Sequence, residues 1–346
     1  MKVSIKLITR FIEDFFILKY LNNRPVKPLL LGYFVTFRCN LKCYYCEYVE
    51  NSDFRNYPEL TTERAIQLLR IARQGVPSIA FSGGEPLVRE DINIVVKAAK
   101  NLGYKPISLF TNGLLLPKKE EVLDYLDFLQ ISLDTIDENK QDSMYATGNG
   151  GQAKQVKEIV SFYARQQHGR DFRINLNAVV TPDNIEDIIE VYNFANDIGV
   201  RLTLCPQLYY GRPLPILINN PKYQSLIDQL IDLKQNNSTI MDIDAFLRHI
   251  RSFKPFRCYP YLTPRIYPNG ELVGPCPIIE QKKYDLLKIG TWKKAYHLLI
   301  KDFGADYICN DPCFLPCYLE TSTLMVQPWK SIGELLRLNQ FHHKEQ

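Results

Sequence analysis

Six short apolar segments, each followed by a segment of helical periodicity, place the strongest constraint on how this chain of 346 residues folds. The apolar segments have the length and composition of buried strands. They span Leu29–Phe37, Ser78–Phe81, Pro106–Phe110, Phe128–Leu133, Arg173–Val180 and Arg201–Cys205. The helical segments span Thr62–Arg73, Asp91–Leu102, Lys118–Leu126, Gln152–Gln166, Asn184–Ile198 and Pro221–Gln235. Such alternation is typical of a parallel sheet with right-handed crossovers. Because a closed barrel of this kind has eight units, we expect an α/β fold with a partial, TIM-like (βα)6 barrel.

The composition excludes several classes of protein. Hydrophobic residues make up 46% of the chain and charged residues 23%, which is ordinary globular usage and excludes a largely disordered chain. The net charge of +4 is too small to indicate a nucleic-acid partner. The sequence has neither an apolar stretch of about 20 residues nor the pattern of a signal peptide. We therefore expect a cytoplasmic protein.

The strand–helix alternation ends near residue 240, which suggests a second domain. Beyond it, Arg265–Val273 reads as two short strands around a Pro-Asn-Gly turn. We expect an N-terminal amphipathic helix within residues 1–28 and a core domain at residues 29–239. A small cysteine-rich domain would follow at residues 240–325. Residues 326–346 would form a C-terminal helix, near Ser331–Phe341, and a tail.

The nine cysteines fall into two groups and one isolated residue. The first cysteine group is Cys39, Cys43 and Cys46, and Cys205 stands alone as a small buried side chain. In a reducing compartment, grouped cysteines are more often metal ligands or catalysts than disulfides. The pattern therefore predicts two metal sites. The second cysteine group consists of Cys258, Cys276, Cys309, Cys313 and Cys317.

Polar residues follow the predicted strands at their carboxyl ends, where folds of this type carry their chemistry. Ser82-Gly83-Gly84-Glu85-Pro86 follows the second strand, and Asn112 follows the third. Ser132 and Asp134 lie at the end of the fourth strand. The first cysteine group follows the first strand, so we expect all these residues to gather at one edge of the sheet.

The first cysteine group lacks the fourth ligand that a zinc site needs, whereas three cysteines can hold a 4Fe–4S cluster with one iron left open. Its spacing is C-x-x-x-C-x-φ-C with an aromatic φ, here Cys39-Asn-Leu-Lys-Cys43-Tyr-Tyr45-Cys46. Together with Gly83-Gly84-Glu85-Pro86, this pattern resembles the radical S-adenosylmethionine (SAM) superfamily. The resemblance covers nearly all of residues 29–236.

The resemblance implies a role for each matching residue. The three cysteines would ligate a 4Fe–4S cluster, and SAM would chelate its fourth iron. The other cofactor-binding residues implied are Tyr45 beside the adenine, Ser82, Gly83, Gly84 and Glu85 around the methionine end, and Ser132 and Asn112 near the ribose. For Ser132 and Asn112, simple capping of strand ends is an equally good interpretation.

The second cysteine group resembles the auxiliary-cluster extension of radical SAM enzymes called SPASM or twitch. The full SPASM pattern uses about seven cysteines for two clusters, and one 4Fe–4S cluster needs four. We therefore expect one auxiliary cluster, held by Cys258, Cys276 and two of Cys309, Cys313 and Cys317. The remaining cysteine would be spare or would donate hydrogen to a product radical. Four thiolates also suit zinc, which stays open as an alternative.

The resemblance implies an enzyme that cleaves SAM reductively to a 5′-deoxyadenosyl radical and modifies a substrate, a lipid or isoprenoid or a peptide. A flavodoxin or ferredoxin would supply the electron. Two other classes are compatible with the cysteines: a non-catalytic iron–sulfur scaffold or electron-transfer protein, and a zinc-binding interaction module. Electron transfer alone needs neither an open iron nor the Gly-Gly-Glu-Pro segment, which favours the enzyme.

The N-terminal segment predicts an amphipathic helix. One interpretation is a helix packed across the open barrel, and the other is a helix that lies on a membrane surface and makes the protein peripheral to the membrane. The polar face is formed by Lys2, Lys6, Arg10 and Glu13, and the apolar face by Ile5, Ile8, Ile12 and Phe15.

Overall fold

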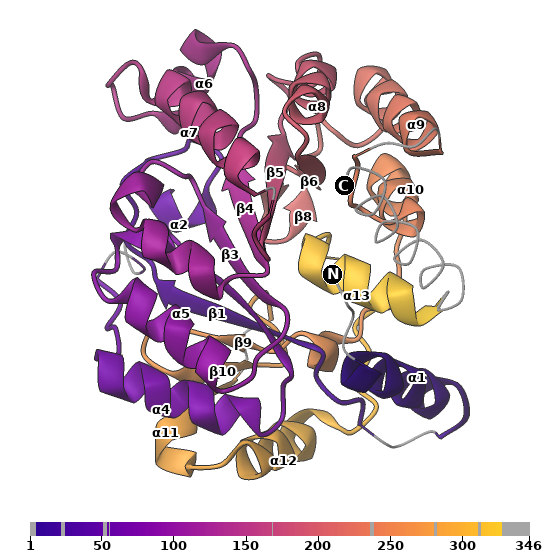
Figure 1. Cartoon of the computed structure of the whole chain (residues 1–346). Coiled ribbons are helices and arrows are strands. Elements are labelled where there is room, and N and C mark those ends of the chain that lie inside the picture. Colours follow the sequence, from indigo (N-terminus) through magenta and orange to yellow (C-terminus); the bar gives the residue numbers. More distant parts are fainter. Residues whose placement is uncertain are drawn as a thin grey trace.

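One large sheet organises the chain. The computed structural model describes residues 5–21, 25–50, 54, 56–167, 169–235, 239–279, 282–310 and 313–326. Nine of the described strands form a sheet in the order β11-β10-β9-β1-β2-β3-β4-β5-β6 (Figure 1). From β1 to β6, each strand pairs in parallel with the next. This arrangement confirms the predicted open α/β barrel. Its strands are Leu30–Thr36 (β1), Ser78–Gly83 (β2), Ile107–Thr111 (β3), Phe128–Ser132 (β4), Arg173–Val180 (β5) and Arg201–Pro206 (β6).

Helices pack against the outer face of this sheet, where they cover its buried apolar side chains (Figure 1). They are α4 (Thr62–Arg73), α5 (Ile92–Asn101), α7 (Gln152–Gln166), α8 (Ile188–Asp197) and α9 (Pro221–Gln235). Helix α6 (Glu138–Tyr145) packs against α7, and α10 (Asp244–Ser252) packs against α9 and α13 (Pro316–Val326). Shorter elements are α2 (Glu47–Glu50), the 3₁₀ turn η1 (Pro86–Val88) and the two-stranded ribbon of β7 (Leu208–Tyr209) and β8 (Arg212–Pro213).

One predicted helix differs from the structure. The segment expected as a helix over Lys118–Leu126 forms two 3₁₀ turns, η2 (Leu116–Lys118) and η3 (Glu120–Tyr125). Pro117 lacks the backbone N–H that a helix interior needs, and the backbone of Lys119 leaves the helical region at φ −130° and ψ 24°. The helical pattern of this segment is therefore broken at its start.

The C-terminal part extends the same sheet. Strand β9 (Arg265–Ile266) pairs in parallel with β1 through Gly32 and Tyr33, and antiparallel with β10 (Glu271–Gly274). The Pro-Asn-Gly turn joins β9 to β10, which confirms the predicted hairpin. The remaining elements are η4 (Pro260–Leu262), β11 (Lys282–Asp285), α11 (Leu286–Ile289), α12 (Trp292–Phe303) and α13 (Pro316–Val326). The predicted helix near Ser331–Phe341, with nearly all of the predicted 326–346 segment, lies outside the described residues.

The N-terminal helix α1 (Ile5–Tyr20) packs on the core through residues that the sequence analysis did not name. Phe11, Ile17 and Leu18 contact the hydrophobic core, and Asp14 between them is fully buried. The helix tolerates a carboxylate on this face because Asp14 Oδ1 accepts the Lys27 backbone N–H at 2.8 Å. The predicted apolar residues Ile12 and Phe15 are half-buried beside this face.

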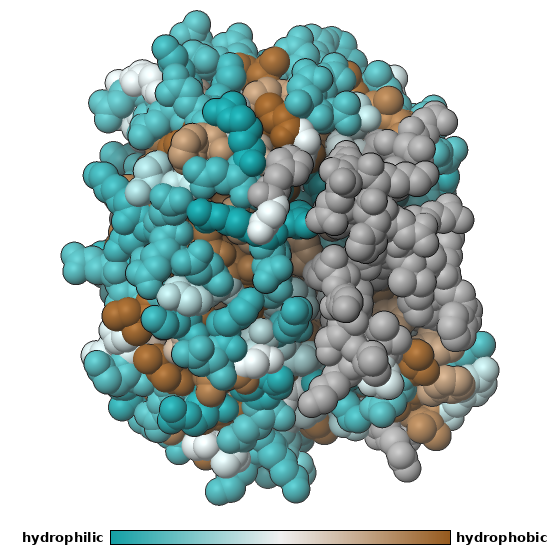
Figure 2. All heavy atoms as spheres, in the orientation of Figure 1, coloured by the Kyte–Doolittle hydropathy of each residue, from teal (hydrophilic) through white to brown (hydrophobic). Residues whose placement is uncertain are grey.

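Hydrophobic side chains are also exposed on α1. Phe16 and Tyr20 are 48% and 61% exposed. In Figure 2, hydrophilic residues cover most of the described surface, and hydrophobic residues appear at the lower right, where Figure 1 draws α1. None of the described helices combines the length and the hydropathy needed to cross a membrane.

Replacement of Asp14 by asparagine is expected to stabilise the protein at pH 8 but much less at pH 5. Burial raises the pKa of Asp14 from 3.8 to about 7, and Asp14 Oδ2 has no hydrogen-bond partner among the described residues. Because the folded state binds this proton more tightly than the unfolded state, the stability of the wild type falls as the pH rises from about 4 to 7. A shift of one unit corresponds to about 1.4 kcal/mol, so we expect a gain of about 1–3 kcal/mol at pH 8. Urea unfolding of the wild type and the variant at pH 5 and pH 8 measures the two free energies of unfolding. An equal gain at both pH values would show that the charge of buried Asp14 does not cause the difference.

Candidate iron–sulfur and SAM site

The first cysteine group lies in a folded loop that directly follows β1. Cys46 N–H donates to the Cys43 carbonyl at 3.0 Å, which closes a turn between two of the cysteines. Lys42 and Tyr44 donate backbone hydrogen bonds to the carbonyls of Tyr145 and Met144, at 3.0 and 3.2 Å. The end of α6, which the sequence analysis did not predict, therefore anchors the cysteine loop to the barrel.

The donor chemistry of this loop fits an iron–sulfur cluster. Cys39, Cys43 and Cys46 are free thiols, and each thiol acts electrostatically on at least one of the others. Within the described parts of the chain, no three His, Cys, Asp or Glu side chains are arranged to hold a single metal ion. In a 4Fe–4S cluster each thiolate bonds a different iron, so the sulfurs need not converge on one point.

Gly83 and Gly84 bring the loop after β2 against the end of β1. A Cβ atom at Gly84 would lie 2.4 Å from the Arg38 carbonyl oxygen, and one at Gly83 would lie 2.0 Å from the Thr36 carbonyl oxygen. Gly83 also has a φ of +145°, which L residues rarely adopt. The Gly84 N–H donates to the Thr36 carbonyl at 2.9 Å. Both glycines are therefore required for the close approach of two backbones beside the cysteine loop.

Glu85 joins the loops that follow β2 and β3. Its side chain is 1% exposed and accepts hydrogen bonds from Leu87 N at 2.9 Å, Thr111 Oγ1 at 2.8 Å and Asn112 N at 2.6 Å. Burial raises the pKa of Glu85 to about 7. Donors of the protein itself bind both carboxylate oxygens of Glu85. Glu85 therefore holds the loops after β2 and β3 together.

Asn112 connects the third strand to the cysteine loop. Its Nδ2 donates to Asn40 Oδ1 at 2.8 Å, and its Oδ1 accepts the Leu114 N–H at 3.1 Å. Asn40 directly follows Cys39, and sequence reasoning gave no signal for it. Ser132 ends β4 with a half-buried side chain, and Ser82 is half-buried near the end of β2. The structure thus brings the predicted residues to one edge of the sheet.

Tyr45 is held by a buried carboxylate. Tyr45 Oη donates to Asp134 Oδ2 at 2.6 Å, and Asp134 also accepts from Val179 N at 2.8 Å and Gln141 Nε2 at 3.3 Å. Asp134 is fully buried, and its burial raises the pKa of its carboxyl group. The pair therefore fixes the aromatic residue of the cysteine motif against the ends of β4 and β5.

A Tyr45→Phe variant is expected to lose about 1–3 kcal/mol of unfolding free energy, because it leaves one oxygen of a buried carboxylate poorly satisfied. Tyr44→Phe is the matched control, since Tyr44 is 41% exposed and donates to a partly exposed Asp183 carboxylate at 2.7 Å. Urea unfolding of both variants measures the difference. Equal losses would show that the buried Tyr45–Asp134 hydrogen bond contributes no more to stability than the partly exposed Tyr44–Asp183 bond.

The concave inner face of the sheet is polar and partly accessible. Paired residues of neighbouring strands point to the same side, and Phe110, Gln130, Asn175 and Arg201 form one such row. In β3, β4 and β6, residues on the inner face are partly exposed, whereas alternate residues on the helix-covered face are buried. The buried atoms Gln130 Oε1 and Asn175 Oδ1 find no hydrogen-bond partner among the described residues. The inner face therefore offers polar groups beneath the cysteine loop.

Four members of the second cysteine group converge. Cys258 and Cys309 form an isolated antiparallel bridge, with reciprocal N–H to carbonyl bonds of 3.0 Å. The Cys258 thiol hydrogen-bonds to Cys313, which raises the pKa of Cys258 and lowers that of Cys313 to about 7. Cys276 packs in the same buried cluster and interacts with Cys309 and Cys313. Cys317 packs in the same cluster, interacts with Cys313 and also contacts the Arg265 guanidinium.

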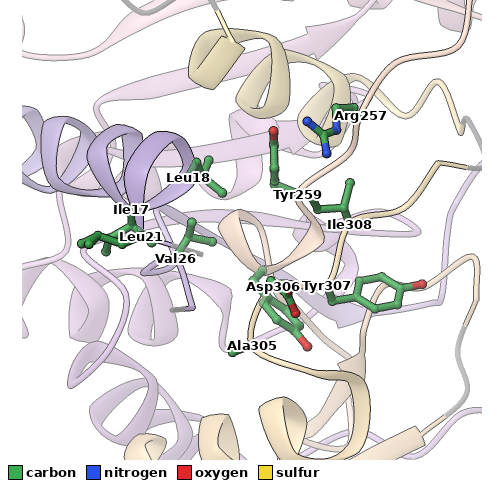
Figure 3. A pocket seen from close by; sticks show the side chains of 11 residues that line it. Ile17, Leu18, Leu21, Val26, Arg257, Tyr259, Ala305, Asp306, Tyr307 and Ile308 are labelled. Carbon is green, nitrogen blue, oxygen red and sulfur yellow. The ribbon is translucent and has the colours of Figure 1, made fainter. Parts of the chain in front are cut away.

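A pocket of about 240 Å³ lies outside this second group (Figure 3). Arg257 and Tyr259, which flank Cys258, line one side, and Tyr307 and Ile308, which precede Cys309, line another. Leu18 of α1 contributes to its apolar wall. Burial and the nearby thiols, Cys309 first, raise the pKa of Tyr307. The pocket therefore approaches the second cysteine group from the α1 side.

Residues 33–195 match the family model described as the radical SAM superfamily. The chain carries a radical SAM domain. A 4Fe–4S cluster and SAM are the cofactors typical of this superfamily, and the donor set of the first cysteine group fits them.

Curated relatives match about half of the chain. A probable GTP 3′,8-cyclase of Methanococcus aeolicus is 31% identical over 193 residues, which are 54% of this chain and 61% of the relative. The GTP 3′,8-cyclase of Limosilactobacillus fermentum is 31% identical over 187 residues, 52% of this chain and 54% of the relative. The chain thus spans little more than half the length of these relatives.

Solved structures show the same fold over nearly all of the chain. Streptococcus suis SuiB has a TM-score of 0.62 at 20% identity, and the match covers 89% of this chain and 70% of SuiB. A histidine-tagged anSMEcpe with bound AdoMet has a TM-score of 0.59 at 18% identity, covering 90% of this chain and 96% of that one. Their likeness therefore extends past the radical SAM domain into the C-terminal part.

Proposed function

We propose that this chain is a radical SAM enzyme with one auxiliary iron–sulfur cluster of the SPASM or twitch type. The observation that carries the proposal is the cysteine loop, which the Gly83-Gly84 contact and the α6 anchor hold at the carboxyl edge of a polar, accessible barrel face. Neither a scaffold nor an electron-transfer protein requires this combination.

Cys39, Cys43 and Cys46 would hold the catalytic cluster. The chemistry that the cluster and SAM supply together is a one-electron cleavage that yields a 5′-deoxyadenosyl radical. The chain itself positions the reactants and limits access of water. Tyr45 keeps one orientation because Asp134 accepts its hydroxyl hydrogen bond, and Asn112 ties the third strand to the loop. Ser132 remains a candidate ribose contact at the end of β4.

Cys258, Cys276, Cys309 and Cys313 would hold the auxiliary cluster. Their direct contacts support this choice among the five cysteines, because Cys258 bridges to Cys309 and hydrogen-bonds to Cys313, and Cys276 interacts with both Cys309 and Cys313. One 4Fe–4S cluster needs four thiolates. Four thiolates also suit zinc, but the described cysteines are not arranged around a single ion, which favours the cluster. Iron, sulfide and zinc analysis of the anaerobically purified protein distinguishes the two.

The substrate would be polar. The partly exposed side chains of the inner face include the polar residues Gln130, Asn177 and Thr203, which can hydrogen-bond to a ligand. A hydrogen-bonding substrate, such as a peptide segment, satisfies these groups, whereas a lipid or isoprenoid chain does not. The GTP of the curated relatives is also polar, but those relatives match only about half of this chain. The electron would come from a flavodoxin or ferredoxin.

The decisive experiment is an assay of 5′-deoxyadenosine by mass spectrometry. The protein is reconstituted anaerobically with iron and sulfide, and then reduced in the presence of SAM. We expect 5′-deoxyadenosine that depends on both the reductant and the iron. A fully loaded protein that releases none with any one-electron donor would favour the scaffold alternative.

A further inference from the structure

Tyr318 is a fully buried tyrosine beside the second cysteine group. It lies in the first turn of α13, directly after Cys317, and it belongs to the same packed cluster as Cys258, Cys276 and Cys313. In the part of the chain that the structure describes, no group forms a hydrogen bond with Tyr318 Oη. Burial of an unpaired hydroxyl costs free energy, so this position favours an acceptor beside the ring.

The face of α13 that carries Tyr318 is directed at the segment of Cys258. Ser322 lies four residues after Tyr318 and therefore on the same face of the helix. Ser322 is fully buried, and its Oγ accepts the backbone N–H of Tyr259 at 3.0 Å. Because Tyr259 directly follows Cys258, this hydrogen bond fixes α13 against the second cysteine group. Tyr318 and Ser322 thus form a buried polar strip along that contact.

The Tyr318 hydroxyl lies within electrostatic range of three thiols. Burial raises the pKa of Tyr318, and the thiols of Cys276, Cys317 and Cys258 raise it further, whereas Arg265 lowers it. The three cysteines belong to different segments of the chain, so their common influence agrees with a hydroxyl that lies among them. At neutral pH the hydroxyl keeps its proton, which makes it available as a hydrogen-bond donor.

Arg265 places a positive charge at the same position. Its guanidinium carbon lies 5.7 Å from the ring centroid of Tyr318 and 5.1 Å from that of Phe34, and its Nη2 donates to Cys317 Sγ. A Cβ atom at Gly32, which pairs with Arg265, would lie 2.5 Å from Arg265 Cδ, so the glycine makes room for this side chain. The buried Arg265 Nε finds no hydrogen-bond partner among the described residues. The site therefore holds two unpaired buried donors beside the cysteines, and one of them carries a positive charge.

We propose that the Tyr318 hydroxyl donates a hydrogen bond to the auxiliary cluster, and that this bond and the charge of Arg265 raise the reduction potential of the cluster. This inference rests on the proposed function. Reduction adds one electron, and hence one negative charge, to a cluster that thiolates already make negative. Hydrogen bonds to the sulfurs and nearby cations stabilise the reduced form more than the oxidised form. Tyr318 therefore makes the auxiliary cluster easier to reduce.

The test begins with Tyr318→Phe, which removes only the hydroxyl. Because this hydroxyl makes no hydrogen bond within the described residues, the variant should keep its fold. The matched control is Tyr33→Phe. Tyr33 is also fully buried with an unpaired hydroxyl, but it packs in the main hydrophobic core beside Phe81 and not with the second cysteine group. Iron and sulfide per chain are measured first, and we expect both variants to match the wild type.

The main readout is the reduction potential of the auxiliary cluster, from a redox titration of the anaerobic holoprotein followed by EPR. SAM alters the EPR signal of the cluster that it binds, so the unaltered signal belongs to the auxiliary cluster. We expect Tyr318→Phe to shift the one-electron equilibrium at least tenfold toward the oxidised form, which is a potential more negative by about 59 mV. Tyr33→Phe should retain the wild-type potential. Equal potentials in the wild type and Tyr318→Phe would overturn the proposal.

Arg265→Gln tests the charge separately. We expect it to lower the same potential, with circular dichroism to verify its fold, and an unchanged potential in the folded variant would refute the role of Arg265. If this variant does not fold, Tyr318→Phe still carries the test. A wild type that holds zinc or no iron in the second cysteine group would instead refute the auxiliary cluster of the proposed function. Full iron content with equal potentials would refute only the role of Tyr318.

Discussion

Replacement of Cys43 by alanine is expected to abolish formation of 5′-deoxyadenosine and to remove about four irons per chain, with little loss of secondary structure. Cys43 is the central member of the first cysteine group, and its carbonyl closes the turn to Cys46. The backbone bonds of Lys42 and Tyr44 to the end of α6 do not depend on the thiol. The loop should therefore keep its fold while it loses a ligand.

The matched control is Cys205→Ala, which removes a thiol of the same barrel that belongs to neither cysteine group. Iron and sulfide content, circular dichroism and the 5′-deoxyadenosine assay are compared for the two variants and the wild type. We expect the control to keep its iron and its product. If Cys43→Ala kept the full iron content, the first cysteine group would not be the site of the cluster.

Replacement of Gly84 by alanine has the second largest expected effect. The added methyl group would overlap the carbonyl oxygens of Arg38 and Phe37, at 2.4 and 2.6 Å, and neither backbone atom can rotate away. The loops after β1 and β2 would have to separate, and the Gly84–Thr36 hydrogen bond would break. We expect a loss of more than about 2 kcal/mol of unfolding free energy and the loss of SAM cleavage.

Gly150→Ala provides the comparison. Gly150 does not have a positive φ, and the nearest atom to its added Cβ, Asp142 Oδ2, lies 3.9 Å away. Its unfolding free energy should stay within about 0.5 kcal/mol of the wild type. Thermal or urea unfolding of the two variants gives the comparison. A Gly84→Ala protein as stable as Gly150→Ala would mean that the two loops do not touch in solution.

The strands could be predicted because each buried strand is a short apolar segment between turn residues. The bounds of α4, α7 and α9 were predicted correctly for a similar reason, since their apolar residues recur at helical spacing. Helix α6 was missed because its large apolar residues, Met144 and Tyr145, stand together at its end. The burial of Asp14 in α1 was not predicted because it depends on a hydrogen bond from the backbone N–H of Lys27, 13 residues away.

The candidate site could be predicted only as a set of residues. Its motif spacing pointed to Cys39, Cys43 and Cys46, but no local pattern indicates that Tyr45 pairs with Asp134, 89 positions along the chain. The same limit applies to the second cysteine group. The spacing left three candidates for two ligand positions, and the bridge between Cys258 and Cys309 is a tertiary contact.

The pairing of β9 with β1 has a consequence for how this protein can be divided. A shortened chain that ended at residue 239 would keep all six parallel strands, but β1 would lose the neighbour that engages Gly32 and Tyr33. An uncovered central strand of this kind offers its free N–H and carbonyl groups to other copies and promotes aggregation. The barrel and the cysteine-rich part are therefore best produced, purified and mutated as one piece.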